Sequence, residues 1–338
     1  MDYQPDVTVE QQAPAAEQSP SLIGFAEGVW HPEDLVRLEG SDWIVISAMR
    51  SIGERGALFA VRADALAPAV EILWRPQAEM GRTSFGAFDP HGVDARKVGA
   101  DRWELLVVDH GGGEAIARLT IGLAPCGEPI VIDGTRIEQP AGTSGNAVAH
   151  MPDGGFMVTS MFDPDNPDLL DDFAAARTTG HVWRWNAASG WRRIGHALAG
   201  ANGIALSADG SRIVVSEWAA RKVWLLSADG EVLGSAEVDF LPDNLRWRQD
   251  GTLLLAGQNA RPEAVFGCEA RGEACPLAYS VAALDPSTMK ITPIMTRSQS
   301  QAEAEGFGGA TGALDVGDEV WVASFTGTRA ARFACRPE

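Results

Sequence analysis

One turn pattern recurs along the whole chain, and this repetition restricts the possible folds more than any other feature. The clearest copy covers residues 202–217, where an apolar strand reaches Asp209-Gly210 and a second strand leaves it. An Asp-Gly pair between two apolar runs is a strong signal for a β-hairpin. Further strand-like segments follow at 222–226 and 231–234. This copy therefore predicts a four-stranded unit.

Similar units begin at six points, separated by roughly 40 to 70 residues, which is typical of propeller blades. Their first strands start near Glu33, His91, Asn146, Asn202, Asp243 and Thr311. We predict an all-β fold, a six-bladed β-propeller with four-stranded blades around a central channel, over residues 21–338. Two β-sandwich domains would not explain a single turn pattern along the chain. Residues 1–20, rich in Gln, Pro, Ala and Glu, are predicted to form a disordered leader.

Composition excludes several classes of partner. The formal net charge of −19 would repel phosphate backbones, so we expect no nucleic-acid partner. No apolar run reaches the ~18 residues of a transmembrane span. The N-terminus has neither a basic start nor an apolar core, so we expect no signal peptide and a cytoplasmic protein. A periplasmic or secreted location is the alternative if such a peptide has been removed. The oligomeric state is left open.

The four cysteines lack the spacing of a zinc site. Cys268 and Cys275 flank a short polar loop and could form a disulfide or stay as free thiols. The long segment after Phe162 is predicted to be a surface loop with one helical turn at 169–175, which could cover the channel mouth. Trp218 is a candidate for a pocket wall.

The predicted channel gathers polar side chains, because the first strand of each blade lines the axis of a propeller. The leading residues of these strands that offer oxygen ligands are Glu33, Asn146, Asn202, Asp243 and Asn244. Two carboxylates and three amides carry a formal charge of about −2, which matches one divalent cation, and such oxygens suit Ca²⁺. Mg²⁺ would want fewer protein ligands. The sequence therefore predicts one divalent cation at the channel mouth, with Ca²⁺ as the expected ion and another hard divalent ion as the alternative.

Two histidines accompany these ligands. His91 lies in the segment Phe88-Asp-Pro-His-Gly-Val93, and His110 ends the segment Leu105-Leu-Val-Val-Asp-His110. We predict a pair in which His91 acts as a general base on water and His110 orients it. A channel histidine bonded only to backbone is the alternative for His91. The remaining histidines, which we expect at the surface or in turns, are His31, His150, His181 and His196.

These segments resemble the serum paraoxonase/arylesterase family, within the wider group that includes SMP-30/gluconolactonase and strictosidine synthase. The resemblance runs from about Glu33 to Phe333 and is most specific in the His91 and His110 segments. It implies a catalytic calcium held by the ligands named above and a His91–His110 dyad. It also implies a second, structural calcium, for which Asp34 and the backbone carbonyl of Val93 match two ligands.

The chain departs from the family pattern at several points. The position after Asn146, an acid in the family, is Ala147 here, which puts the second ion in doubt. Cys335 matches half of the family's disulfide, but no cysteine precedes Cys126 to complete it. Gln258 stands where the family has another pocket histidine. The substrate therefore cannot be transferred from the family.

Four functions remain open at this point. The first is a calcium-dependent hydrolase of lactones or aryl esters, in which the metal polarises the carbonyl and the dyad activates water. The second is a gluconolactonase-like sugar lactonase that uses the metal without the histidines. The third is a metal-assisted lyase or isomerase acting on a small metabolite. The fourth is a non-catalytic binding propeller, since a fold alone does not fix a function.

Overall fold

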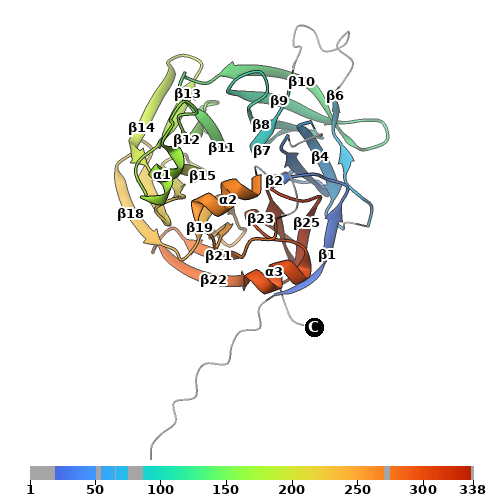
Figure 1. Ribbon diagram of the computed structural model, residues 1–338. Helices are drawn as coiled ribbons and strands as arrows, with labels where there is room; N and C mark the ends of the chain where they lie inside the picture. The colour runs from blue at the N-terminus through green and yellow to red at the C-terminus, as the bar shows by residue number, and fades with distance from the viewer. Residues whose placement is uncertain (1–19, 51–54, 65, 75–86, 270–274, 336–338) are drawn as a thin grey trace, which may run out of the picture.

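Six β-sheets surround a common axis in the computed structural model, which describes residues 20–50, 55–64, 66–74, 87–269 and 275–335 (Figure 1). The predicted all-β six-bladed propeller is confirmed. Its strands run from Ser21 to Ala334. The leader predicted at residues 1–20 falls almost entirely outside the described residues.

The four main strands of each blade form an antiparallel sheet, and in the first five blades these strands follow one another in the chain from the axis outward. Blade 1 contains β2 (Pro32–Arg37), β3 (Trp43–Ala48), β4 (Ala57–Arg62) and β5 (Val70–Glu71). Blade 2 contains β7 (Pro90–Gly99), β8 (Arg102–Asp109), β9 (Ala115–Leu123) and β10 (Pro129–Glu138), with the short β6 (Leu73–Trp74) parallel to β10 at its outer edge. Blade 3 contains β11 (Ser144–His150), β12 (Phe156–Phe162), β13 (Gly180–Asn186) and β14 (Gly190–Leu198).

The second half of the ring repeats this order. Blade 4 contains β15 (Ala201–Leu206), β16 (Arg212–Glu217), β17 (Lys222–Ser227) and β18 (Val232–Glu237). Blade 5 contains β19 (Leu241–Trp247), β20 (Leu253–Gln258), β21 (Tyr279–Asp285) and β22 (Lys290–Arg297). Blade 6 contains β23 (Ala310–Val316), β24 (Glu319–Ser324), β25 (Arg329–Ala334) and β1 (Ser21–Glu27). The innermost strands are therefore the ones that the repeat places first in each unit.

The last blade is completed by the first strand of the chain. β1 pairs antiparallel with β25, with Phe25 opposite Ala331. The sequence pattern supplies only three strands for this unit, and the partner lies some 300 residues away, so the repeat alone does not reveal it. The pairing covers an edge that would otherwise leave backbone N–H and C=O groups without partners. It also ties the two ends of the ring together.

The Asp209-Gly210 turn shows why the repeat carries glycines at fixed positions. Gly210 has a φ of +69°, and the side chain of Asp209 accepts a hydrogen bond from the Ser211 N–H at 3.0 Å. A Cβ at Gly210 would also lie 2.8 Å from the Pro152 ring, between blades 3 and 4. The turn thus needs glycine for its backbone conformation and for the contact between blades.

The described residues also form three short helices outside the sheets: α1 (Leu169–Ala174), α2 (Pro262–Glu269) and α3 (Gln299–Glu305). The helical turn predicted at 169–175 corresponds to α1. Phe173 of α1 stacks on Phe266 of α2 with ring centroids 5.7 Å apart, and α2 lies over the centre of the ring in Figure 1. A disulfide joins Cys268 in α2 to Cys275. Of the helices described, none is long and apolar enough to cross a membrane.

Candidate metal and catalytic site

A β-bulge interrupts each of the six innermost strands. Each register shift encloses one of the leading residues of the repeat: Glu33, His91, Asn146, Asn202, Asp243 with Asn244, and Thr311. A bulge adds a residue that has no ladder partner and bends the strand, so it redirects side chains that regular pairing would hold against a neighbouring blade. The bulges therefore bring these side chains to one level of the channel.

Two glycines allow neighbouring bulges to approach each other closely. A Cβ on Gly92 would collide with the backbone carbonyl of Asn146, and a Cβ on Gly203 would collide with that of Asp243. Gly92 and Gly203 are therefore explained by this close approach, because the lack of a side chain lets the bulge of the next blade reach the axis.

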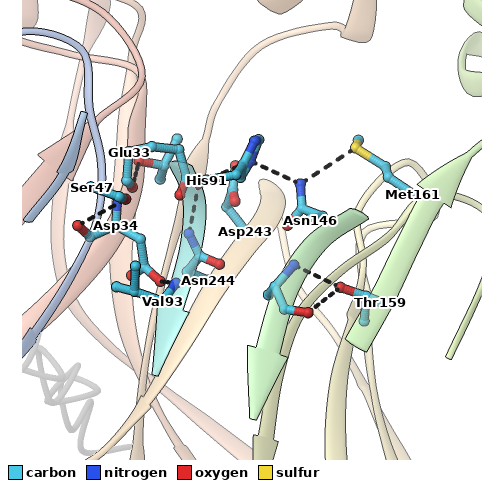
Figure 2. Close-up of polar contacts among 12 residues, drawn as sticks. Glu33, Asp34, Ser47, His91, Val93, Asn146, Thr159, Met161, Asp243 and Asn244 are labelled. Carbon is cyan, nitrogen blue, oxygen red and sulfur yellow. Dashed lines mark hydrogen bonds and ion pairs between the residues drawn. The ribbon is translucent and has the colours of Figure 1, made fainter. Parts of the chain in front are cut away.

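The bulged residues from different blades contact one another in the channel (Figure 2). The Asn244 side-chain amide donates to Glu33 Oε1 at 2.8 Å, and Glu33 Oε1 lies 3.4 Å from His91 Nε2. The Asn146 amide in turn donates to His91 Nε2 at 3.3 Å. Glu33, Asn146 and Asn244 are all buried, and Asn202 and Asp243 are buried beside them. The sequence-predicted ligands thus come together in space.

We call Glu33, Asn146, Asn202, Asp243 and Asn244 together the ligand ring. Four oxygen atoms of the ligand ring are buried and have no hydrogen-bond partner among the described residues. They are Glu33 Oε2, Asn146 Oδ1, Asn202 Oδ1 and Asp243 Oδ1. Leaving such an acceptor unsatisfied costs about 1–3 kcal/mol, and more for a charged group. All four residues line the same cavity. This convergence of hard oxygen donors, one from each of four blades, fits a hard divalent cation.

The charge of the ring also favours a cation. Burial, followed by the nearby Glu33 carboxylate, raises the pKa of Asp243 well above its ordinary value. A bound cation would offset both effects and favour the ionised carboxylates. Within the described residues, no group of three or more His, Cys, Asp and Glu side chains has metal-site geometry. The ring instead combines two carboxylates with amides, a donor set that suits Ca²⁺ rather than Zn²⁺.

The imidazole rings of His91 and His110, which the sequence analysis predicts to act together, lie within hydrogen-bonding distance of each other. His91 Nδ1 lies 3.1 Å from His110 Nε2, and His110 Nδ1 lies 2.8 Å from Glu114 Oε1. All these contacts are satisfied when Nδ1 of each ring carries its hydrogen. His91 Nε2 then presents a lone pair to the ring of ligands, and each Nδ1–H donates to the next group in the series His91, His110, Glu114.

Glu114 is a functional candidate that the sequence analysis missed. Burial raises the pKa of this carboxyl, but the hydrogen bond and charge of His110 and the hydrogen bond from the Gly145 N–H hold it below its ordinary value. The Gly145 N–H donates to Glu114 Oε2 at 2.9 Å and so fixes the carboxylate. Glu114 follows His110 by four residues across a glycine-rich turn. An acid so close to a candidate base is the signal that could have revealed it.

Gln258 supports the ring from the side, at the position where the resemblance expects a histidine. Its amide donates to Asp243 Oδ2 at 2.8 Å and to the Ala310 carbonyl at 2.8 Å. Its own oxygen accepts a hydrogen bond from the Trp218 indole N–H at 2.9 Å. Gln258 therefore orients Asp243 through a neutral amide, and Trp218 forms part of the pocket wall as predicted.

The ring opens into a cavity of about 350 Å³. Its polar lining includes His91, His110, Glu114, Arg50 and Asp89. Its apolar wall is formed where Met161, Phe162, Trp218, Val265 and Phe266 pack together, and Phe325 adds a further apolar side chain to the lining. Phe266 belongs to α2, and Phe162 is the last residue of β12, where the long loop starts. The cavity thus combines polar side chains with an apolar wall.

Arg246 contacts both residues that were predicted to hold a second cation, Asp34 and Val93. The Asp34 carboxylate and the Val93 carbonyl, the two ligands predicted for it, both accept hydrogen bonds from Arg246. The prediction for the other histidines is wrong for His150, which is nearly buried and lies with Nδ1 2.7 Å from Asp94 Oδ2. Because His150 ends an inner strand, its partner comes from the neighbouring blade.

Comparisons with known proteins support the fold. No family model and no curated protein matches this sequence. Similar solved structures include a gluconolactonase from Xanthomonas campestris, with 17% identity, a TM-score of 0.54 and coverage of 95% of this chain and 96% of that one. A luciferin-regenerating enzyme has 12% identity and a TM-score of 0.56, covering 91% and 92% of the respective chains. The calcium-binding protein regucalcin from Agrobacterium tumefaciens has 12% identity and a TM-score of 0.52, covering 92% and 93%.

Proposed function

We propose that this protein is a calcium-dependent hydrolase of lactones or aryl esters, with His91 as the general base. The observation that carries the proposal is a set of four buried oxygens near His91 Nε2 that line one cavity and have no hydrogen-bond partner among the described residues. The solved structures named above add support, since one is a gluconolactonase and another binds calcium. The residues that would hold the ion are Glu33, Asn146, Asn202, Asp243 and Asn244.

The reaction divides between the ion and the side chains. Bound calcium would polarise the substrate carbonyl and stabilise the oxyanion that develops on it. His91 Nε2 would take a proton from the attacking water, which a neutral imidazole does well near neutral pH. His110 would accept the hydrogen bond from His91 Nδ1–H, and Glu114 would accept the one from His110. This series stabilises the positive charge that His91 gains.

The apolar wall favours a substrate with an apolar part. Burial of an apolar side chain is worth about 1.5–3 kcal/mol, so an aryl or alkyl group against Phe162 and Phe266 would bind more tightly than a polyhydroxylated ring. A sugar lactonase is the second candidate, because a gluconolactonase has the same fold at 17% identity. That candidate needs polar partners for each sugar hydroxyl, which this wall does not supply.

A substrate panel separates the two candidates. We expect turnover of phenyl acetate and of γ- and δ-lactones in the presence of Ca²⁺, with kcat/KM rising by about 10-fold or more from a short to a medium alkyl substituent. A sugar lactone as the best substrate would favour the second candidate. If a bound, stabilising cation is present but no ester or lactone is turned over, the site belongs to a lyase, an isomerase or a binding protein.

Replacement of Glu114 tests whether it positions the histidine pair. We expect Glu114→Gln to lower kcat by about 10- to 100-fold, the usual effect of losing a partner that orients a catalytic group. Loss of the carboxylate also disfavours the protonated base, so the acidic limb of the kcat/KM profile should move to lower pH. Glu138→Gln, an exposed acid in the same blade, is the control. If Glu114→Gln has the wild-type pH profile of kcat/KM, Glu114 does not act on His91 through His110.

A further inference from the structure

Next to the ligand ring, the channel contains the positively charged guanidinium of Arg246. Arg246 lies on β19, two residues after Asn244, and both side chains contact residues of blade 1. Its side chain is only 12% exposed. A guanidinium stays protonated at every physiological pH, so this charge is permanent.

The partners of Arg246 come from two other blades. Its Nη2 lies 2.5 Å from Asp34 Oδ2 and also donates to the Val93 carbonyl. Its Nε donates to the Leu35 carbonyl at 3.1 Å. Asp94 Oδ1 lies 4.0 Å from Nη1. Arg246 thus joins β19 to β2 and β7, the strands that carry Glu33 and His91.

Carboxylates and backbone carbonyls are the oxygens that a hard cation takes. Around Arg246, however, they already have donors: Asp34 Oδ2 also accepts from the Val93 N–H at 3.0 Å, and Asp34 Oδ1 accepts from the Leu35 N–H at 2.8 Å. The ligand ring differs, since four of its oxygens have no hydrogen-bond partner in the part of the chain that the structure describes. Blade 3 adds no carboxylate from the residue that follows Asn146, because this residue is Ala147.

We propose that the Arg246 guanidinium takes the place of a second metal ion in this channel. The protein then binds a single hard divalent cation, at the ring of Glu33 and its neighbours. Arg246 acts as a positioning residue, because it holds the ligand-bearing strands β2 and β19 and the strand of His91, β7, at a fixed separation without depending on a dissociable ion. The count at the ring rests on the proposed function, whereas the claim about Arg246 rests on its own contacts.

Counting bound Ca²⁺ per chain by equilibrium dialysis tests both parts separately. We expect one ion for the wild-type protein, none for Glu33→Gln, two for Arg246→Ala and one for the double variant Glu33→Gln/Arg246→Ala, since removal of the guanidinium takes its hydrogen bonds away from the Asp34 carboxylate and from two backbone carbonyls. Arg246→Lys keeps the charge and should bind one ion. Arg248→Ala, which removes an equal charge paired with Asp315 at 2.8 Å, should also bind one.

Two wild-type ions, or an Arg246→Ala chain that binds no more than the wild type, would overturn the inference. No wild-type ion with one in Arg246→Ala would instead refute the ring site and leave the role of Arg246 standing. If Arg246→Ala does not fold, the wild-type count decides, because one ion supports the inference and two contradict it.

Discussion

Replacing His91 by glutamine should lower kcat for lactone or ester hydrolysis by about 10² to 10⁴-fold, the usual contribution of a general base. His91 Nε2 lies at the ring of ligands, and its Nδ1 lies 3.1 Å from His110 Nε2. Glutamine keeps a polar group of similar reach but cannot take a proton at neutral pH. The loss should therefore fall on kcat, while calcium binding stays close to that of the wild type.

The comparison needs a matched variant, and His196 provides it. This histidine is exposed on β14, where its ring packs against Trp224 at 4.8 Å between centroids. His196→Gln should leave both kcat and calcium binding unchanged. If His91→Gln folds, binds calcium and keeps the wild-type rate, His91 is only a channel histidine and the sugar lactonase without a dyad becomes the better description.

Replacing Glu33 by glutamine should abolish the effect of calcium on stability. A ligand at 100 times its Kd stabilises a folded protein by about 2.7 kcal/mol, so the wild-type free energy of unfolding should rise by that order when Ca²⁺ is added. Glutamine at position 33 still accepts from Asn244 through its oxygen but removes one of the two carboxylates. The calcium-induced increase should disappear in this variant, together with turnover.

Without a metal ion, the wild-type protein should lose its advantage in stability over Glu33→Gln. Burial and the Glu33 charge raise the pKa of Asp243, so without a cation the two carboxylates destabilise each other. Glu33→Gln should then be at least as stable as the wild type in EDTA, measured by chemical denaturation. Glu231→Gln, an exposed acid in blade 4, makes the same change in charge and should behave like the wild type. A metal-free Glu33→Gln that is clearly less stable would show that Glu33 has a structural role instead.

The repeat carries most of the information about the fold. Because each unit contains the same hairpin signals, the sequence predicts the blades and their phase, and the phase brings Glu33, Asn146, Asn202 and Asp243 together. The closing pair of β1 and β25 is missed, since a single strand at the start of a chain carries no periodic signal of its partner. The bulges are missed because a two-residue period says nothing about where one extra residue is inserted.

The supporting residues are harder to predict for a related reason. Glu114 reaches His110 only because the intervening glycine-rich turn bends the chain back, and Gly145 from the next blade holds it. Arg246 lies two residues after Asn244 on the same strand, but its partners Asp34 and Val93 lie in other blades. Contacts between blades depend on the ring geometry, and a single sequence does not specify that geometry.

The most direct test of the account is hydrolysis of a medium-chain δ-lactone by one preparation, measured in Ca²⁺, then in excess EDTA, and again after Ca²⁺ is restored. We predict turnover in the first and third conditions and its loss in the second, because the unpartnered oxygens of the ring would hold the ion that polarises the carbonyl. Turnover that continues unchanged in EDTA would contradict a calcium-dependent hydrolase.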